Sequence, residues 1–304
     1  MVGTSLSLGF AALFGVNQII MRRGVLRASV NYVANISIFS GPLFFALIAL
    51  ITGELPKMGQ FTWQTYIYFA LAGVIHFAFG RTFAYRSVQL IGATRSNSVT
   101  GLNAIVSVAL AIAVLHERLT PLVVLGMMLS MSGPLIIGMK ESTRSGTRTR
   151  ASSNGKDVDS GTLWRGILFG LGASLFWGSS SVLIKLGLDN GGLPIAGSMV
   201  CYLAASTAVS YKLLDRQTRR EILTPNRPAL QLALMTGMTT NLAQLMRFIA
   251  LDHAPVITVS LVSRTVPVWV LILAFLLNRH LESFSRWVLL GNGLLVAGTV
   301  LVII

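Results

Sequence analysis

Runs of apolar residues alternate with short polar segments along the whole chain. A helix rises about 1.5 Å per residue and the hydrocarbon core of a bilayer is about 30 Å thick, so some 20 apolar residues can cross it. We expect ten membrane helices. Their approximate ranges are 4–21, 33–52, 63–90, 94–115, 121–139, 163–187, 194–213, 229–251, 256–277 and 285–304.

One segment differs from all the others in composition. Residues 140–161, KESTRSGTRTRASSNGKDVDSG, are rich in Ser, Thr, Gly and charge and contain almost no apolar side chain. Such a composition is typical of a flexible linker. The linker divides the chain into two regions, 1–139 and 162–304, each with five predicted helices.

The two regions resemble each other in sequence, which indicates an internal repeat. One alignment pairs Asn17 with Ser180, and another pairs Gly126 with Gly291. Because each repeat has an odd number of helices, the second copy enters the membrane in the opposite direction. Inverted repeats with a site between them are typical of secondary transporters. The matching stretches are ALFGVNQIIMRRG (12–24) with LFWGSSSVLIKLG (175–187), and HERLTPLVVLGMMLSMSG (116–133) with LESFSRWVLLGNGLLVAG (281–298).

Composition supports a membrane location. Charged residues make up 11% of the 304 residues, whereas a soluble domain carries about 25%. We therefore expect an integral, multi-pass protein of the cell membrane that contacts membrane lipids. The net charge of +14 does not indicate a nucleic-acid partner, because Lys and Arg lie mostly at the ends of apolar runs, where membrane proteins carry them.

The distribution of these basic residues predicts an orientation. Loops after odd-numbered helices hold most of the Lys and Arg that lie outside membrane depth, and loops after even-numbered helices hold three, Lys57, Arg118 and Lys185. The positive-inside rule then puts the odd loops in the cytoplasm and both termini outside.

Several of these stretches together resemble a known family. The segments ALFGVNQIIMRRG, LHERLTPLVVLG and ALDHAP…TVPVW…LES…LLGNGLLVAG are similar to EamA-domain proteins of the drug/metabolite transporter superfamily. The resemblance implies two five-helix repeats around a central cavity lined mainly by helices 1, 3, 4, 6, 8 and 9, with helices 5 and 10 peripheral. It also implies transport of small metabolites by alternating access. Members of this family usually have cytoplasmic termini, whereas the loop charges predict external termini, so the orientation stays open.

The charge within the predicted helices is entirely basic. All ten acidic residues fall in loops or at helix ends, while Arg264 lies near the middle of the ninth helix and Arg81 lies in the third helix after His76. An ionisable residue inside the membrane is costly and is a functional-site hypothesis by default. We expect Arg264 and Arg81 to line the cavity; the alternative is structural bonding to helix carbonyls. Arg86, Arg95 and Arg247 lie nearer helix ends and are expected to reach phospholipid headgroups.

Uncharged polar residues at similar depth complete the predicted substrate site. They are Asn17, Ser180, Asn241 and Gln244, together with His76. Interhelical hydrogen bonding is the alternative role for each of them. Pro267 keeps a proline that the family resemblance places early in the ninth helix, and it is our candidate hinge; the fourth helix has Asn103 at the matching place.

Motifs of enzymes and metal sites are missing from the sequence. It has no GxSxG, HExxH or Walker A pattern, one cysteine (Cys201), and no pair of histidines spaced like metal ligands on one face. We predict no cofactor, no metal and no enzymatic activity.

The leading hypothesis is a secondary-active transporter of a small metabolite that carries a carboxylate or phosphate, because a cation would meet only arginines inside the membrane. A scramblase or flippase with an arginine-lined groove is the main alternative. An intramembrane enzyme, with His76 as its base, is a third.

Overall fold

The computed structural model describes residues 1–24, 30–91, 93–145, 160–214, 219, 227–277 and 286–303. These residues are almost entirely helical, and no strand occurs among them. The helices are α1 (Val2–Gly24), α2 (Val30–Ile51), α3 (Trp63–Gly73), α4 (Arg81–Ile91), α5 (Ala93–Thr100), α6 (Asn103–Leu115), α7 (Pro121–Ser145), α8 (Ser160–Asp189), α9 (Pro194–Val209), α11 (Arg227–His253), α12 (Val256–Val262), α13 (Val266–Leu277) and α14 (Arg286–Ile303). Short turns adjoin them: η1 (Pro56–Gln60), the π-helical turn η2 (Val74–Gly80), η3 (Ser210–Leu214) and η4 (Ser263–Thr265).

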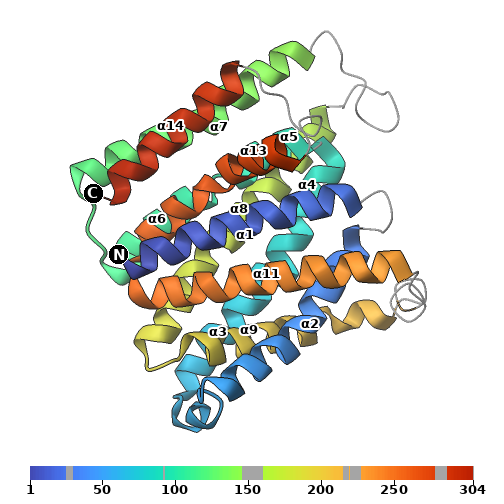
Figure 1. The fold of residues 1–304 in the computed structure, drawn as a ribbon, viewed down its shortest axis with the longest axis vertical. Coiled ribbons are helices and arrows are strands. Elements are labelled where there is room, and N and C mark those ends of the chain that lie inside the picture. Colours follow the sequence, from blue (N-terminus) through green and yellow to red (C-terminus); the bar gives the residue numbers. More distant parts are fainter. Residues whose placement is uncertain are drawn as a thin grey trace.

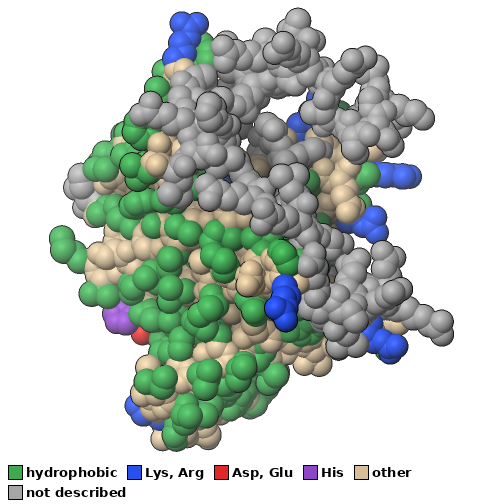
Figure 2. Space-filling model, turned by 45° about the vertical axis from the view of Figure 1, so that its right-hand side comes forward, with side chains coloured by type: hydrophobic (Ala, Val, Ile, Leu, Met, Phe, Trp, Pro, Cys, Tyr) green, Lys and Arg blue, Asp and Glu red, His purple; other side chains and the backbone are tan. Residues whose placement is uncertain are grey.

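Six helical segments are long and apolar enough to cross a membrane, which supports a multi-pass membrane protein. They are Val2–Ile20, Tyr32–Ile51, Trp63–Ile91, Gly161–Asp189, Val256–Leu276 and Arg286–Ile303. Three shorter helices are also apolar. Helix α11 has 27 residues but is not among the six, because polar side chains interrupt its apolar sequence. Figure 2 shows a broad hydrophobic face with most of the visible Lys and Arg at its margins.

Every predicted membrane segment overlaps a helix or a run of adjacent helices, but three segments are not continuous α-helices. The third contains the π-helical turn η2, the fourth is broken between α5 and α6, and the ninth is broken at η4. The ends of the predicted linker are helical, since α7 reaches Ser145 and α8 begins at Ser160. Its centre, 146–159, lies outside the described residues, as do most of the basic loops that predict the orientation.

The helices form one bundle with a separate pair at its edge (Figure 1). Helices α7 and α14 lie side by side in that pair, as expected for peripheral fifth and tenth helices. In the main body α1 packs on α11, α2 packs on α9 and α11, and α8 packs on α3, α4 and α6. Both chain termini lie at the same end of the bundle.

Four glycines hold α7 against α14 in a reciprocal pattern. A Cβ built on Gly126 would lie 2.6 Å from the carbonyl oxygen of Gly298, and one on Gly133 would collide with the carbonyl oxygen of Gly291. The repeat alignment makes Gly126 equivalent to Gly291 and Gly133 equivalent to Gly298. The contact between Gly126 and Gly298 is therefore repeated, with the two repeats exchanged, by the contact between Gly291 and Gly133. Such a reciprocal contact is the signature of a two-fold relation between two copies of one surface.

Two acidic residues cap helices that lie far away in the sequence. Oε2 of Glu54 accepts hydrogen bonds from the backbone N–H groups of Ile195 (3.0 Å) and Ala196 (2.8 Å) at the start of α9. The carboxylate of Glu117 likewise accepts from Val256 (2.6 Å) and Ile257 (3.0 Å) at the start of α12. Helix N-termini carry unsatisfied N–H donors, so both side chains stabilise these ends as hydrogen-bond acceptors.

Glutamine at position 54 is expected to be at least as stabilising as glutamate at neutral pH. Burial raises the pKa of Glu54, and the two backbone hydrogen bonds only partly offset it. The contribution of Glu54 to the free energy of unfolding is thus fully present below the pKa of an unfolded glutamate, about 4.3. It is lost as the pH rises through the higher pKa that Glu54 has in the folded protein.

Glu54→Gln keeps an oxygen that can accept both hydrogen bonds and carries no charge. It should match the parent in acid and equal or exceed it at pH 7. Glu54→Ala has no acceptor and should lose about 0.5–2 kcal/mol. Thermal unfolding in detergent as a function of pH measures both effects; a Gln variant less stable than the Ala variant at pH 7 would contradict the prediction.

Candidate functional site

Helix α11 turns a polar face toward the inside of the bundle. Thr236, Thr240, Gln244 and Arg247 follow one another at spacings of four, four and three residues, which places them on one side of a helix. The exposed fraction is 4% for both threonines, 3% for Gln244 and 8% for Arg247. A polar face buried this fully in a membrane protein is characteristic of a cavity or a hydrogen-bond network, not of contact with lipid.

Arg247 is the most buried charge described in the bundle. Its NH2 group donates to Ser181 Oγ at 2.6 Å and, more weakly, to Ser180 Oγ at 3.5 Å, and its NH1 group donates to Gln244 Oε1 at 3.3 Å. Within the described part of the chain no carboxylate forms an ion pair with it. The hydroxyl groups of α8 and the side-chain amide of Gln244 on α11 therefore stabilise the positive charge of Arg247.

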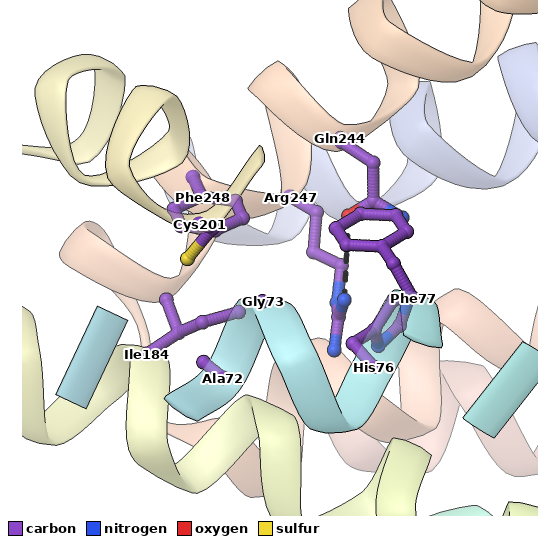
Figure 3. Close-up of a pocket in the computed structure, with 9 residues that line it drawn as sticks. All are labelled: Ala72, Gly73, His76, Phe77, Ile184, Cys201, Gln244, Arg247 and Phe248. Atoms are coloured by element: carbon purple, nitrogen blue, oxygen red, sulfur yellow. Dashed lines mark hydrogen bonds between the residues drawn. The ribbon is translucent and has the colours of Figure 1, made fainter. Parts of the chain in front are cut away.

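A narrow pocket surrounds this arginine, between α3, η2, α8, α9 and α11 (Figure 3). Its polar side chains are His76, Gln244 and Arg247, with Cys201 on the opposite side. The space among the lining atoms is too narrow to hold a water molecule, whereas small-molecule sites usually offer about 300–1,000 Å³. This part of the bundle is therefore closely packed in the structure and has no open cavity for a substrate.

His76 approaches the pocket from the π-helical turn η2. Its Nδ1 lies 2.8 Å from Ser180 Oγ, and its backbone carbonyl accepts a hydrogen bond from Trp177 Nε1 at 3.1 Å. Figure 3 shows the Arg247 side chain running from α11 toward this turn. π-Helical turns inside α-helices are frequent at functional sites, because the extra residue per turn changes which side chains face inward.

Two helices are interrupted at corresponding places in the two repeats. Helix α5 ends at Thr100 and α6 begins at Asn103, while α12 ends at Val262 and α13 begins at Val266. The offset that aligns Gly126 with Gly291 also brings these two breaks to within a few residues of each other. Backbone hydrogen bonds continue through both places, as from the N–H of Gly101 to the carbonyl of Asn97 and from the N–H of Ser263 to the carbonyl of Val259. The breaks are therefore irregular turns within helices, and such paired irregularities are common at transporter binding sites.

Arg264 lies in the second break and faces the first. Its two terminal nitrogens lie 3.0 and 3.2 Å from the position that a Cβ on Gly101 would occupy. Its Nε is buried and has no hydrogen-bond partner among the described residues. A Cβ at position 101 would make the guanidinium shift by a few tenths of an ångström. Pro267 follows at the second residue of α13, so a break is present beside it; its movement as a hinge stays a prediction.

Arg81 is held by helix α2. Its NH1 group donates to the carbonyl oxygen of Ala34 at 3.0 Å and to Ser37 Oγ at 3.1 Å, and its guanidinium carbon lies 5.6 Å from the centre of the Phe77 ring. This is the carbonyl bonding that the sequence left as the alternative. It leaves part of the guanidinium free, so a role in substrate binding stays a prediction.

The two predicted asparagines join α11 to other helices. Asn17 Oδ1 accepts from Thr239 Oγ1 at 3.2 Å, and Asn241 Nδ2 donates to Ser40 Oγ at 3.3 Å. Both side chains are buried, and Asn241 Oδ1 has no partner in the part of the chain that the structure describes. Neither asparagine lines the pocket around Arg247.

The structure thus brings three predicted residues together, His76, Ser180 and Gln244, and adds Arg247 at their centre. The prediction that Arg247 reaches lipid headgroups is wrong, because its side chain is buried and bonded to Ser181. Its distance from the helix end misled that prediction, whereas its spacing from Gln244 on one polar face was the informative signal. Arg86 and Arg95, by contrast, are exposed.

Comparisons with known proteins agree with this architecture. The model of the EamA-like transporter family matches residues 1–139 and 164–304. A protein of known crystal structure superimposes with a TM-score of 0.75 over 99% of this chain and 96% of its own, at 14% sequence identity. Identity this low shows a shared fold alone. No curated protein matches the chain.

Proposed function

This chain belongs to the EamA-like transporter family, and from that premise we propose that it is a secondary-active transporter that moves a small metabolite across the cell membrane by alternating access. The family resemblance drawn from the sequence is thereby confirmed, and with it a multi-pass membrane transporter. We also propose that the chain crosses the membrane ten times and that its two five-helix repeats have opposite orientations. The reciprocal glycine contacts of α7 and α14 support that arrangement.

The proposed substrate is an anion that carries a carboxylate or a phosphate. One observation carries this proposal: Arg81, Arg247 and Arg264 lie inside the bundle, and the described carboxylates lie at helix ends or in loops. A cation entering this space would be repelled by about 4 kcal/mol for each charge 4 Å away, at an effective dielectric near 20. An anion would gain the same amount.

Two groups of residues are proposed to contact the substrate. Arg264 supplies a guanidinium at the paired helix breaks, where its Nε has no partner among the described residues. Arg247 supplies a second guanidinium beside His76, Ser180 and Gln244. Guanidinium groups suit this role because their planar fork matches the geometry of carboxylate and phosphate. The closed pocket must widen to admit a metabolite, and the breaks beside Arg264 are where the helices can bend.

The scramblase alternative is less well supported. A groove for lipid headgroups needs arginines that open to the bilayer along one side of the molecule. Arg247 is only 8% exposed, and Arg81 is engaged with α2. These arginines suit a substrate that is enclosed by the bundle.

Purified protein in liposomes tests the proposed function. The test panel contains malate, pyruvate, glycerol 3-phosphate and glucose 6-phosphate as anions, and a quaternary ammonium dye as the cation. We expect exchange of at least one anion across the membrane and none of the dye. Movement of the dye without any of the anions would contradict the proposal.

A further inference from the structure

The hydroxyl group of Ser180 determines which nitrogen of His76 carries hydrogen. Ser180 Oγ donates its single hydrogen to the backbone carbonyl of Trp177 at 2.8 Å. The same oxygen receives a weak hydrogen bond from Arg247. With that hydrogen assigned to the Trp177 carbonyl, Ser180 Oγ accepts at its 2.8 Å contact with His76 Nδ1, because a hydroxyl has one hydrogen and two lone pairs. Nδ1 is then the protonated nitrogen of the neutral ring.

The other ring nitrogen, Nε2, is left with a free lone pair. No described residue forms a hydrogen bond with it, although the ring lines the pocket that Gln244 and Arg247 share. A neutral imidazole with one anchored nitrogen and one free nitrogen is a proton acceptor held in a fixed orientation. In this tautomer His76 can therefore take up a proton at Nε2.

The described side chains around His76 are either basic or uncharged. Arg247 on α11 shares Ser180 with it, and Arg81 on α4 contacts Phe77, whose ring centre is 4.6 Å from that of His76. Helix α8 contributes Ser180 and Trp177, and α9 contributes Cys201 and Tyr202. No described carboxylate faces the ring. A proton on His76 would add a third positive charge to this region. An anion bound at the same time would offset that charge.

We propose that His76 binds a proton together with the anionic substrate, so that the protein is a proton–anion symporter. This inference rests on the proposed function, because it requires an anion in the pocket. The proton adds to the Nε2 lone pair on one side of the membrane and leaves it on the other, and no other bond changes. Substrate and proton move in the same direction.

The coupling follows from reciprocity between two binding events. The anion neutralises the arginines and so favours the proton on His76, and by linkage the proton favours the anion to the same extent. An empty carrier has both sites unoccupied, and a loaded carrier has both occupied. These are the two states that alternating access must move across the membrane, and a singly loaded carrier is disfavoured.

Liposomes with a pH gradient test the proposal. The probe is the panel anion that exchanges fastest, the membrane potential is clamped with valinomycin and potassium, and a trapped pH-sensitive dye reports protons. With an interior one pH unit more alkaline, coupling of one proton to each anion should accumulate the anion about tenfold, since one pH unit is a tenfold ratio. The dye should report acidification inside that starts with anion uptake.

His76→Asn removes the titrating nitrogen and keeps an amide N–H that can donate to Ser180. It should slow exchange and abolish both the accumulation and the acidification. His253→Gln is the matched control, because His253 is an exposed histidine at the end of α11; it should behave like the parent.

The outcomes separate the two claims. Exchange of an anion by the parent without accumulation or acidification would overturn the proton coupling and leave the proposed function standing. Exchange of none of the anions would overturn the proposed function and the coupling with it. Coupling that persists in His76→Asn would assign the proton to another group. The parent alone decides the matter if the variant does not fold.

Discussion

Replacing Arg264 with glutamine is expected to reduce anion transport about 10- to 100-fold and to leave the protein folded. A hydrogen bond to a charged group contributes about 1.5–3 kcal/mol, which corresponds to that loss. The buried Nε of Arg264 has no hydrogen-bond partner among the described residues, so the substitution removes no hydrogen bond of this atom to the described part of the protein. Arg264→Lys should restore only part of the activity, because an ammonium cannot reproduce the two parallel bonds of a guanidinium.

Arg86→Gln is the control for this prediction. Arg86 is an exposed arginine on α4, and its substitution should change transport little. Transport of the fastest panel anion, with expression and unfolding temperature measured in parallel, distinguishes the outcomes. Normal transport by Arg264→Gln together with loss in Arg86→Gln would show that the site is elsewhere. Failure of Arg264→Gln to fold would show that the guanidinium has a structural role.

Replacing Arg247 with glutamine is expected to affect both transport and stability. The side chain donates hydrogen bonds to Ser181, Ser180 and Gln244. Its removal leaves buried acceptors without a donor, which costs about 1–3 kcal/mol. Transport should also fall at least about tenfold, since the loss of one charge-assisted bond to the substrate is of that size. The two arginine variants therefore differ in stability, although both lose transport.

Two further variants separate these effects of Arg247. Ser181→Ala removes only the 2.6 Å hydrogen bond and should lower stability without removing the charge. Arg227→Gln changes an exposed arginine at the start of the same helix and should stay within about 0.5 kcal/mol of the parent. Thermal unfolding in detergent and liposome transport are the measurements. An Arg247→Gln variant with unchanged stability would contradict the packing described for α11.

The overall architecture was largely predictable from the sequence. The length of an apolar run and its lack of charge are local properties, and they are enough to specify a membrane helix. The repeat was predictable because equivalent positions carry equivalent residues, as with Gly126 and Gly291. The reciprocal contact between α7 and α14 then follows from self-complementary surfaces that both repeats encode.

The sequence also indicated part of the candidate site. It identified His76, Ser180 and Gln244 as polar residues at membrane depth, and the structure brings them together. It pointed to a hinge at Pro267, close to Arg264, but it did not indicate that Arg264 lies outside this pocket. Nor did it indicate the break between α5 and α6, because Gly101 alone does not specify an interruption in a helix.

Tertiary structure alone decided which way the polar side chains face and what they meet. Arg247 was expected at the lipid headgroups from its distance to the helix end, yet the packing of α11 against α8 turns it inward. Glu54 and Glu117 were expected near helix ends, but the helices that they cap begin about 140 residues later in the chain. Depth along a helix follows from the local sequence. Rotation about its axis and the identity of its neighbours follow from contacts between segments that are distant in the sequence.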